Sequence, residues 1–153
     1  MKRFLASGFG VGLVWQNIFG NKKGGGTLAP LIFTILVYFF NLNVLALSIL
    51  FVSLLLIYFY SVEDHYADED PSWITLDEIV GMSLVSLASP SEMLPLIAGF
   101  LVFRASDILK QPKFVSQLED YPGKLGVLYD DLGAGLLGLL SATIVHQVSL
   151  LTL

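Results

Sequence analysis

The feature that most constrains the fold of this chain is an apolar stretch without a single charge, residues 28–60. As one helix it would be about 50 Å long, well beyond the ~30 Å hydrocarbon core of a bilayer. Asn41 and Asn43 interrupt the stretch, and asparagine is frequent in turns. We therefore expect an antiparallel helical hairpin here. Its first arm, residues 28–40, is short for a complete span unless the glycine-rich residues before it contribute.

The composition is that of a membrane protein. Charged residues make up 14% of the 153 residues and hydrophobic residues 55%, whereas soluble domains carry about 25% charged residues. The net charge of −5 argues against a nucleic-acid-binding protein. The chain has no cysteine, which excludes disulfides, thiolate nucleophiles and cysteine-ligated metals. Its length indicates a single domain, residues 1–153.

Two more apolar regions follow the hairpin. Residues 79–89 and 93–103 would each form a helix of about 16 Å, too short to span alone, so they are either a re-entrant pair or core helices. Residues 125–153 are apolar again and contain small residues that allow close helix contacts in a membrane, namely Gly126, Gly133, Gly135 and Gly138. The predicted fold is all-α, a compact helical membrane bundle with two apolar hairpins and a C-terminal apolar helix.

The basic residues predict the topology. They flank the two hairpins at Lys2, Arg3, Lys22 and Lys23 on one side and Arg104, Lys110, Lys113 and Lys124 on the other. The positive-inside rule places both groups in the cytoplasm. Because a hairpin returns the chain to the side it left, the acidic segment 61–78 is expected there too. Every long polar stretch then faces one compartment.

The first group of candidate functional residues lies in "DPSWITLDEIVGM", residues 70–82. Asp77 and Glu78 stand at the boundary between a polar segment and an apolar helix. They favour a functional site, although acids at a helix N-terminus are also stabilised by the helix dipole. We interpret the outer acids of the segment as a solvated loop; these are Glu63, Asp64, Asp68 and Glu69.

The second group lies in "FRASDILK", residues 103–110. Arg104, Asp107 and Lys110 are spaced three apart, which places them on one face of a helix. That face is either a surface ladder of ion pairs, which would contribute little, or a functional face. In a functional face, Arg and Lys would hold a phosphate and Asp would hold a metal.

The third group is the pair Asp130 and Asp131 in "YDDLGAG". A charge within a membrane segment costs at least ~2.5–3.5 kcal/mol and marks function by default. Two adjacent carboxylates in such a setting need a cation. The alternative is a pair in the first turn of a helix, still in contact with water. We interpret His65 as a solvated loop residue and His146 as packed or interfacial.

Two glycine-rich stretches are less specific. "GFGVG" follows a basic start like that of a signal peptide, but its glycines interrupt the apolar region, so we expect the N-terminus to be retained. No strand precedes it, which argues against a dinucleotide fingerprint. "KKGGGTL" either presents backbone N–H groups to a phosphate or is a flexible cytoplasmic linker.

Carboxylates without cysteine favour Mg²⁺, which binds through a few carboxylates and a substrate phosphate. With Arg and Lys nearby, the expected substrate is a phosphorylated lipid headgroup and the expected chemistry metal-assisted phosphoryl transfer. The alternative is a non-enzymatic membrane protein, an ion-binding or transport subunit with a carboxylate cation site. Transporters place their acids near the bilayer midplane, whereas the acids here gather at one interface beside bases.

The chain resembles the phosphatidylglycerophosphatase A family, Mg²⁺-dependent lipid phosphatases of bacterial membranes. The matching blocks are "GFGVGL" (8–13), "DPSWITLDEIVGM" (70–82), "FRASDILK" (103–110) and "PGKLGVLYDDLGAG" (122–135). The resemblance implies an all-helical, multi-pass protein of the bacterial inner membrane with a cytoplasmic active site. It implies hydrolysis of the terminal phosphate of phosphatidylglycerophosphate, which gives phosphatidylglycerol.

The resemblance also implies the site residues. The catalytic and metal-binding carboxylates would be Asp77, Glu78, Asp107, Asp130 and Asp131, with Asp70 as a further metal ligand, and the phosphate-binding residues Arg104, Lys110 and Thr27. Either water or one of the carboxylates would be the nucleophile. The chain departs from the family pattern at "KKGGGTL", where Gly26 and Thr27 correspond to part of a Pro-Gly-Thr-x-Gly-Ser-like stretch. It departs again at residues 111–113, where the family has Pro-x-Pro.

Overall fold

The computed structural model describes residues 1–20, 24–67, 71–88 and 92–152, apart from the side chain of Tyr66, and all regular secondary structure in these ranges is helical. The all-α prediction is therefore confirmed. The helices are α1 (Lys2–Ala6), α2 (Val11–Phe19), α3 (Gly25–Phe40), α4 (Val44–Ser61), α5 (Asp64–Ala67), α6 (Leu76–Val85), α7 (Met93–Leu109), α8 (Lys113–Glu119) and α9 (Lys124–Thr152).

The predicted hairpin of residues 28–60 is formed by α3 and α4. Asn41 ends α3 in the left-handed conformation, and Asn43 caps α4 by accepting a 2.9 Å hydrogen bond from the Ala46 N–H. The glycine-rich lead-in does join the first arm, because α3 begins at Gly25 and reaches 16 residues. Among the described residues, α4 and α9 are long and apolar enough to cross a membrane.

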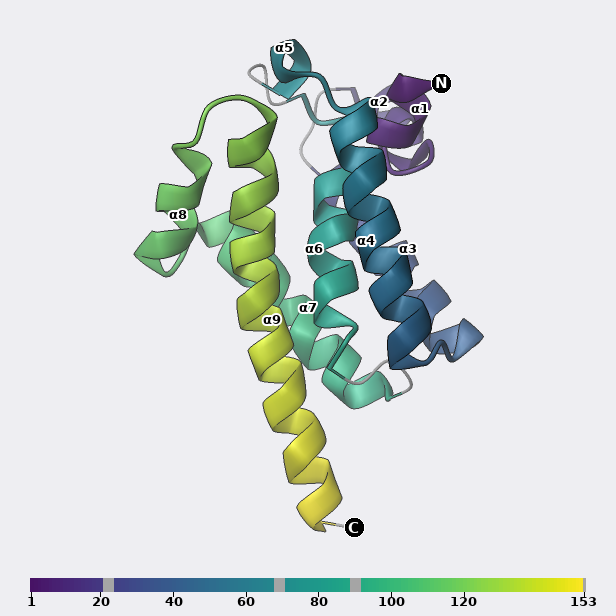
Figure 1. Cartoon of the computed structure of the whole chain (residues 1–153), viewed down its shortest axis with the longest axis vertical. Helices are drawn as coiled ribbons and strands as arrows, with labels where there is room; N and C mark the ends of the chain where they lie inside the picture. The colour runs from purple at the N-terminus through teal and green to yellow at the C-terminus, as the bar shows by residue number, and fades with distance from the viewer. Residues whose placement is uncertain (21–23, 68–70, 89–91, 153) are drawn as a thin grey trace.

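The helices form a bundle around α6 (Figure 1). α6 lies between α9 on one side and the α3–α4 pair on the other, and α7 packs along α9. The short helices α1, α2 and α5 gather at the end of the bundle where α9 begins, while the C-terminus lies at the opposite end (Figure 1). The molecule therefore has a polar end, built from short helices and loops, and an apolar body.

The second pair of helices differs from the sequence prediction in its limits. α6 begins at Leu76 and ends at Val85, and α7 continues past the apolar residues 93–103 as far as Leu109. The charged run "FRASDILK" is thus the end of a helix. It stays helical because its polar side chains face the interior of the bundle, where Asp107 is 9% exposed.

Close backbone contacts hold α9 against its two neighbours. A Cβ atom on Gly135 would lie 2.8 Å from the Gly81 carbonyl oxygen of α6, and one on Gly138 would lie 2.8 Å from the Gly99 carbonyl oxygen of α7. Neither contact leaves room for a side chain. The predicted role of small residues in close helix packing is confirmed at Gly135 and Gly138.

The first turn of α9 is fixed by α4 and α5. The Tyr58 hydroxyl donates a 2.7 Å hydrogen bond to the Lys124 carbonyl oxygen, and Asp64 Oδ1 accepts one of 3.2 Å from the Lys124 N–H. These bonds satisfy backbone groups at the start of α9 and set its position relative to α4 and α5.

Of the acids predicted to form a solvated loop, Asp64 is exposed but belongs to α5, and Glu63 is partly exposed. Asp68 and Glu69 lie outside the described residues.

Candidate metal and phosphate site

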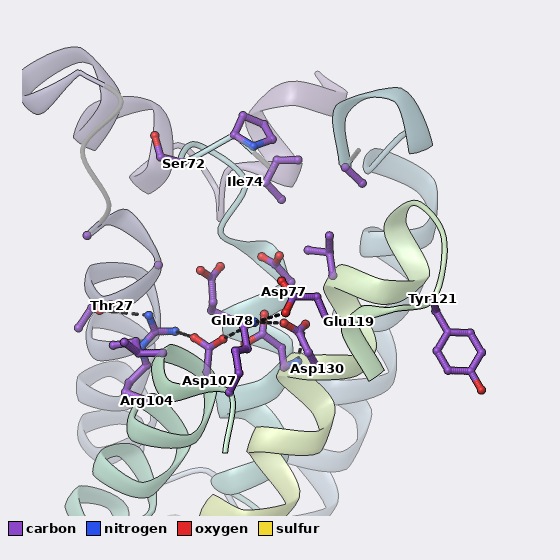
Figure 2. A pocket seen from close by; sticks show the side chains of 18 of the residues that line it. Thr27, Ser72, Ile74, Asp77, Glu78, Arg104, Asp107, Glu119, Tyr121 and Asp130 are labelled. Atoms are coloured by element: carbon purple, nitrogen blue, oxygen red, sulfur yellow. Dashed lines mark hydrogen bonds and ion pairs between the residues drawn. The ribbon is translucent and has the colours of Figure 1, made fainter. Parts of the chain in front are cut away.

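One pocket at the polar end of the bundle collects the predicted site residues (Figure 2). Its volume is about 820 Å³. Residues from α3, α6, α7 and α9 line it, namely Thr27, Asp77, Glu78, Arg104, Asp107, Lys110, Asp130 and Asp131. Asp70, the remaining predicted ligand, lies outside the described residues. The blocks that the sequence singled out separately are therefore neighbours in space.

Three carboxylates in this pocket approach one another. Asp77 and Glu78 come from the first turn of α6 and Asp131 from the second turn of α9, and one oxygen of each lies within 4.8 Å of the other two. The close contact of Gly81 with Gly135 lies four residues, about one helical turn, beyond Asp77 and Asp131 respectively. The glycine crossing thus sets the separation of the carboxylates.

The three carboxylates have the chemistry of a cation site. Asp77 and Asp131 are each 4% exposed. Within the described part of the chain, Glu78 Oε2 and Asp131 Oδ1 are buried without a hydrogen-bond partner. Burial raises the pKa of the Glu78 carboxyl well above its usual range, and the adjacent Asp77 charge adds to the effect. Ligand oxygens lie 2.0–2.1 Å from Mg²⁺, hence at most about 4 Å from one another, so small side-chain movements would bring them into place.

The charges that line the pocket support the same conclusion. Its acids are Asp77, Glu78, Asp107, Glu119, Asp130 and Asp131, and its bases are Arg104 and Lys110. Six acids against two bases leave four negative charges in excess when all are ionised. A divalent cation would offset part of that excess, because bound cations are often the largest local charges in such sites.

The guanidinium of Arg104 lies between α7 and α3. Its Nη1 is 2.5 Å from Asp107 Oδ2, and its Nη2 donates a 3.2 Å hydrogen bond to Thr27 Oγ1 (Figure 2). Arg104 Nε is buried, with no partner among the described residues. The predicted ion pair within "FRASDILK" therefore exists, but its side chains are 11% and 12% exposed, so it is not a surface ladder.

Lys110 ends α7 in the left-handed conformation and joins the two remaining acids. Its Nζ forms an ion pair with Asp130 and lies 3.4 Å from Asp107 Oδ1. Burial alone would lower the pKa of Lys110, but the hydrogen bond and charge of Asp130 raise it above its usual value. The other Asp130 oxygen accepts a 2.9 Å bond from the Asp131 N–H. Asp107 and Asp130 thus face bases, and their assignment as metal ligands stays a prediction.

Comparison with known proteins identifies the family of the chain. The model of the family described as phosphatidylglycerophosphatase A matches residues 4–146. The chain belongs to the phosphatidylglycerophosphatase A family. A protein of Bacteroides thetaiotaomicron named "Putative phosphatidylinositol-3-phosphatase" is 41% identical over 70 residues, which cover 44% of this chain and 43% of that relative. The match therefore spans less than half of the relative. No solved structure matches the chain.

Two residues that the sequence analysis did not single out, Ser72 and Glu119, also line the pocket. Ser72 lines the pocket with a buried hydroxyl that has no partner in the described chain, and Glu119 lies 3.8 Å from Lys110. Ser72 lies within the family block 70–82, and this was the sequence signal that could have identified it. Nothing in the sequence around Glu119 marked it, because only the fold brings α8 to the pocket.

The histidines lie outside the pocket lining. His146 Nδ1 is 2.9 Å from Glu92 Oε1, an ion pair between α9 and the residue that precedes α7. His65 is exposed beside Glu63. The interpretation of His146 as packed or interfacial is confirmed. His65 is exposed as expected, but it lies in the short helix α5 and not in a loop.

Proposed function

We propose that the protein is a Mg²⁺-dependent phosphatase that removes the terminal phosphate of phosphatidylglycerophosphate at the cytoplasmic face of a bacterial inner membrane. The observation that carries the proposal is one pocket with two complementary parts. Three carboxylates, those of the buried Asp77 and Asp131 and of the partly buried Glu78, suit a divalent cation, and Arg104 beside them suits a phosphate. Membership of the phosphatidylglycerophosphatase A family supports the same chemistry.

The two bases of the pocket would bind the phosphate of the substrate. Arg104 and Lys110 would hold the terminal phosphate, exchanging part of their contacts with Asp107 and Asp130 for contacts with phosphate oxygens. Arg104 Nε has a donor to spare for this purpose. Charge that develops on the phosphoryl oxygens during the reaction would then be stabilised by donors already in place.

The carboxylates of Asp77, Glu78 and Asp131 would hold the cation, with Asp70, Asp107 and Asp130 as further candidates. Bound Mg²⁺ supplies polarisation of the phosphate and a lowered pKa for the attacking water. In the overall reaction, the water oxygen bonds to phosphorus as the ester P–O bond to the glycerol breaks, and a proton passes to the leaving oxygen. The products are phosphatidylglycerol and inorganic phosphate.

The alternative, an ion-binding or transport subunit, uses the same carboxylates. Arg104 argues against it, because a guanidinium in a cation pathway repels the cation that the pathway conducts.

The deciding assay uses the purified protein in mixed micelles with phosphatidylglycerophosphate. We expect phosphate release that needs Mg²⁺ and stops with EDTA. Absence of release with intact Mg²⁺ binding would favour the alternative. The assay should also test phosphatidylinositol 3-phosphate as a second substrate, because the similar Bacteroides thetaiotaomicron protein is named as a putative phosphatase of that lipid.

The cytoplasmic orientation of the pocket rests on the bases around it. Lys2 and Arg3 lie in α1, Lys113 begins α8 and Lys124 begins α9; α1, α8 and the start of α9 all lie in the half of the bundle away from the C-terminus (Figure 1). The natural chain has no cysteine, so single cysteines can report topology directly. Lys113→Cys, exposed on α8, should react with a membrane-impermeant maleimide in inside-out vesicles only. Val44→Cys, 53% exposed at the opposite end of α4, is the matched control and should show the reverse.

A further inference from the structure

The three consecutive glycines before Thr27 are packed against three different partners, which argues against a flexible linker. A Cβ atom on Gly24 would lie 2.8 Å from Trp15 Cε2 of α2, and one on Gly25 would lie 3.0 Å from the Ser72 carbonyl oxygen. A Cβ atom on Gly26 would overlap Glu78 Oε1 and lie 2.8 Å from Glu78 Cδ. Each glycine thus brings the start of α3 against another segment of the polar end.

The contact of Gly26 is the one that bears on the site. Among the described glycines, Gly26 is the one whose added Cβ atom would meet a side-chain atom of the three-carboxylate group, and that side chain is Glu78. The same position on Gly26 is 3.5 Å from Arg104 Nη2, so Gly26 lies where the carboxylate group and the guanidinium meet. Any side chain here would displace Glu78 or Arg104.

We infer that Gly26 is a positioning residue for the metal site. Its bare Cα lets the Glu78 carboxylate lie against the first turn of α3, and this backbone surface directs one Glu78 oxygen toward Asp77 and Asp131. The partial positive charge at the start of α3 stabilises a carboxylate held there. The inference rests on the metal site of the proposed function and adds a residue that acts on this site through Glu78.

The inference predicts a specific rescue. Gly26→Ala should push the Glu78 carboxylate out of place and weaken Mn²⁺ binding by about 10–100-fold, as loss of a residue that orients a ligand does. Glu78→Asp shortens the side chain by about 1.5 Å, the length of one C–C bond. The double variant Gly26→Ala/Glu78→Asp should therefore bind Mn²⁺ more tightly than Gly26→Ala alone. Gly25→Ala is the matched control, because its new methyl group faces Ser72 and not Glu78.

The experiment measures Mn²⁺ affinity by electron paramagnetic resonance and the melting temperature of each variant in EDTA. The expected result is a weak Gly26→Ala variant, a smaller effect of Gly25→Ala, and partial recovery of both affinity and melting temperature in the double variant. Wild-type affinity in Gly26→Ala would overturn the inference. A double variant no better than Gly26→Ala, including a pair that both fail to fold, would overturn it too.

The outcome also separates this inference from the proposed function. If the wild-type protein binds no Mn²⁺, the metal site itself is wrong and the positioning role falls with it. If the wild-type protein binds Mn²⁺ and the rescue fails, only the role of Gly26 is wrong.

Discussion

Two groups of carboxylates share the pocket and differ in what faces them. Asp77, Glu78 and Asp131 face one another, and Glu78 Oε2 and Asp131 Oδ1 are buried without a hydrogen-bond partner in the described chain. Asp107 and Asp130 face Lys110, and Asp107 also faces Arg104. The first group has the chemistry of a cation site, whereas each acid of the second group is paired with a base of the chain. Residues of one chemical type, a few ångströms apart, therefore have opposite requirements, and substitutions can test this difference.

The largest effect is expected at Asp131. Asp131→Asn removes a charged ligand from the first group while preserving its shape. Because a bound metal contributes several kcal/mol to transition-state stabilisation, phosphate release should fall by about 10³-fold or more. The measurement is kcat/KM with phosphatidylglycerophosphate at saturating Mg²⁺. Turnover near the wild-type level would show that Asp131 is not part of the site.

A smaller loss is expected at the basic side of the pocket. Arg104→Lys keeps the charge but cannot contact Asp107, Thr27 and a phosphate together, because lysine lacks the planar fork of donors. We expect kcat/KM to fall by about 10²-fold, with Mn²⁺ affinity close to that of the wild type. An equal loss of Mn²⁺ affinity would mean that the two parts of the pocket are not separate.

A substitution in the second group, Asp107 and Asp130, should lower the stability of the fold. Asp107→Asn leaves the buried Arg104 guanidinium without its charged partner, and breaking a buried pair costs about 3 kcal/mol. The midpoint of thermal unfolding in detergent should therefore fall, with or without Mg²⁺. An unchanged midpoint would show that the ion pair of Arg104 and Asp107 contributes nothing measurable to the stability of the fold.

The smallest effect has the opposite sign. In EDTA, Asp131→Asn should unfold at a higher temperature than the wild type, because it removes charge repulsion within the three-carboxylate group. The free energy of unfolding should rise by about 1 kcal/mol, somewhat less than the ~1.4 kcal/mol that corresponds to a tenfold change in an equilibrium constant. Added Mg²⁺ should stabilise the wild type and not the variant. A variant that is less stable than the wild type in EDTA would contradict the first group's need for a cation.

Much of the fold could be predicted because it depends on local pattern. The uncharged stretch with Asn41 and Asn43 defined the first hairpin, and the glycines of residues 125–153 indicated close helix contacts. The end of α7 was not predicted. A charged run after an apolar arm resembles a loop, and only the pocket explains why it stays helical to Leu109.

The site was predicted as a set of residues but not as an arrangement. Carboxylates beside apolar residues, together with the family resemblance, identified Asp77, Glu78, Asp107, Asp130 and Asp131. Which of them face a base depends on where Lys110 points, and Lys110 reaches Asp130 across 20 residues of sequence. The contact of Gly26 with Glu78 joins residues 52 positions apart, and no local pattern encodes it.

The length of α9 has a consequence for where the chemistry can take place. From Asp131 to Thr152 the helix rises over 21 residues, about 32 Å, which is close to the ~30 Å thickness of a hydrocarbon core. For an α9 that spans a bilayer, this length would place Asp131 near one water boundary, at the depth of the lipid phosphates. Bilayers of longer or shorter acyl chains should then shift the pocket relative to the headgroups, so the rate in vesicles should peak at a matching thickness.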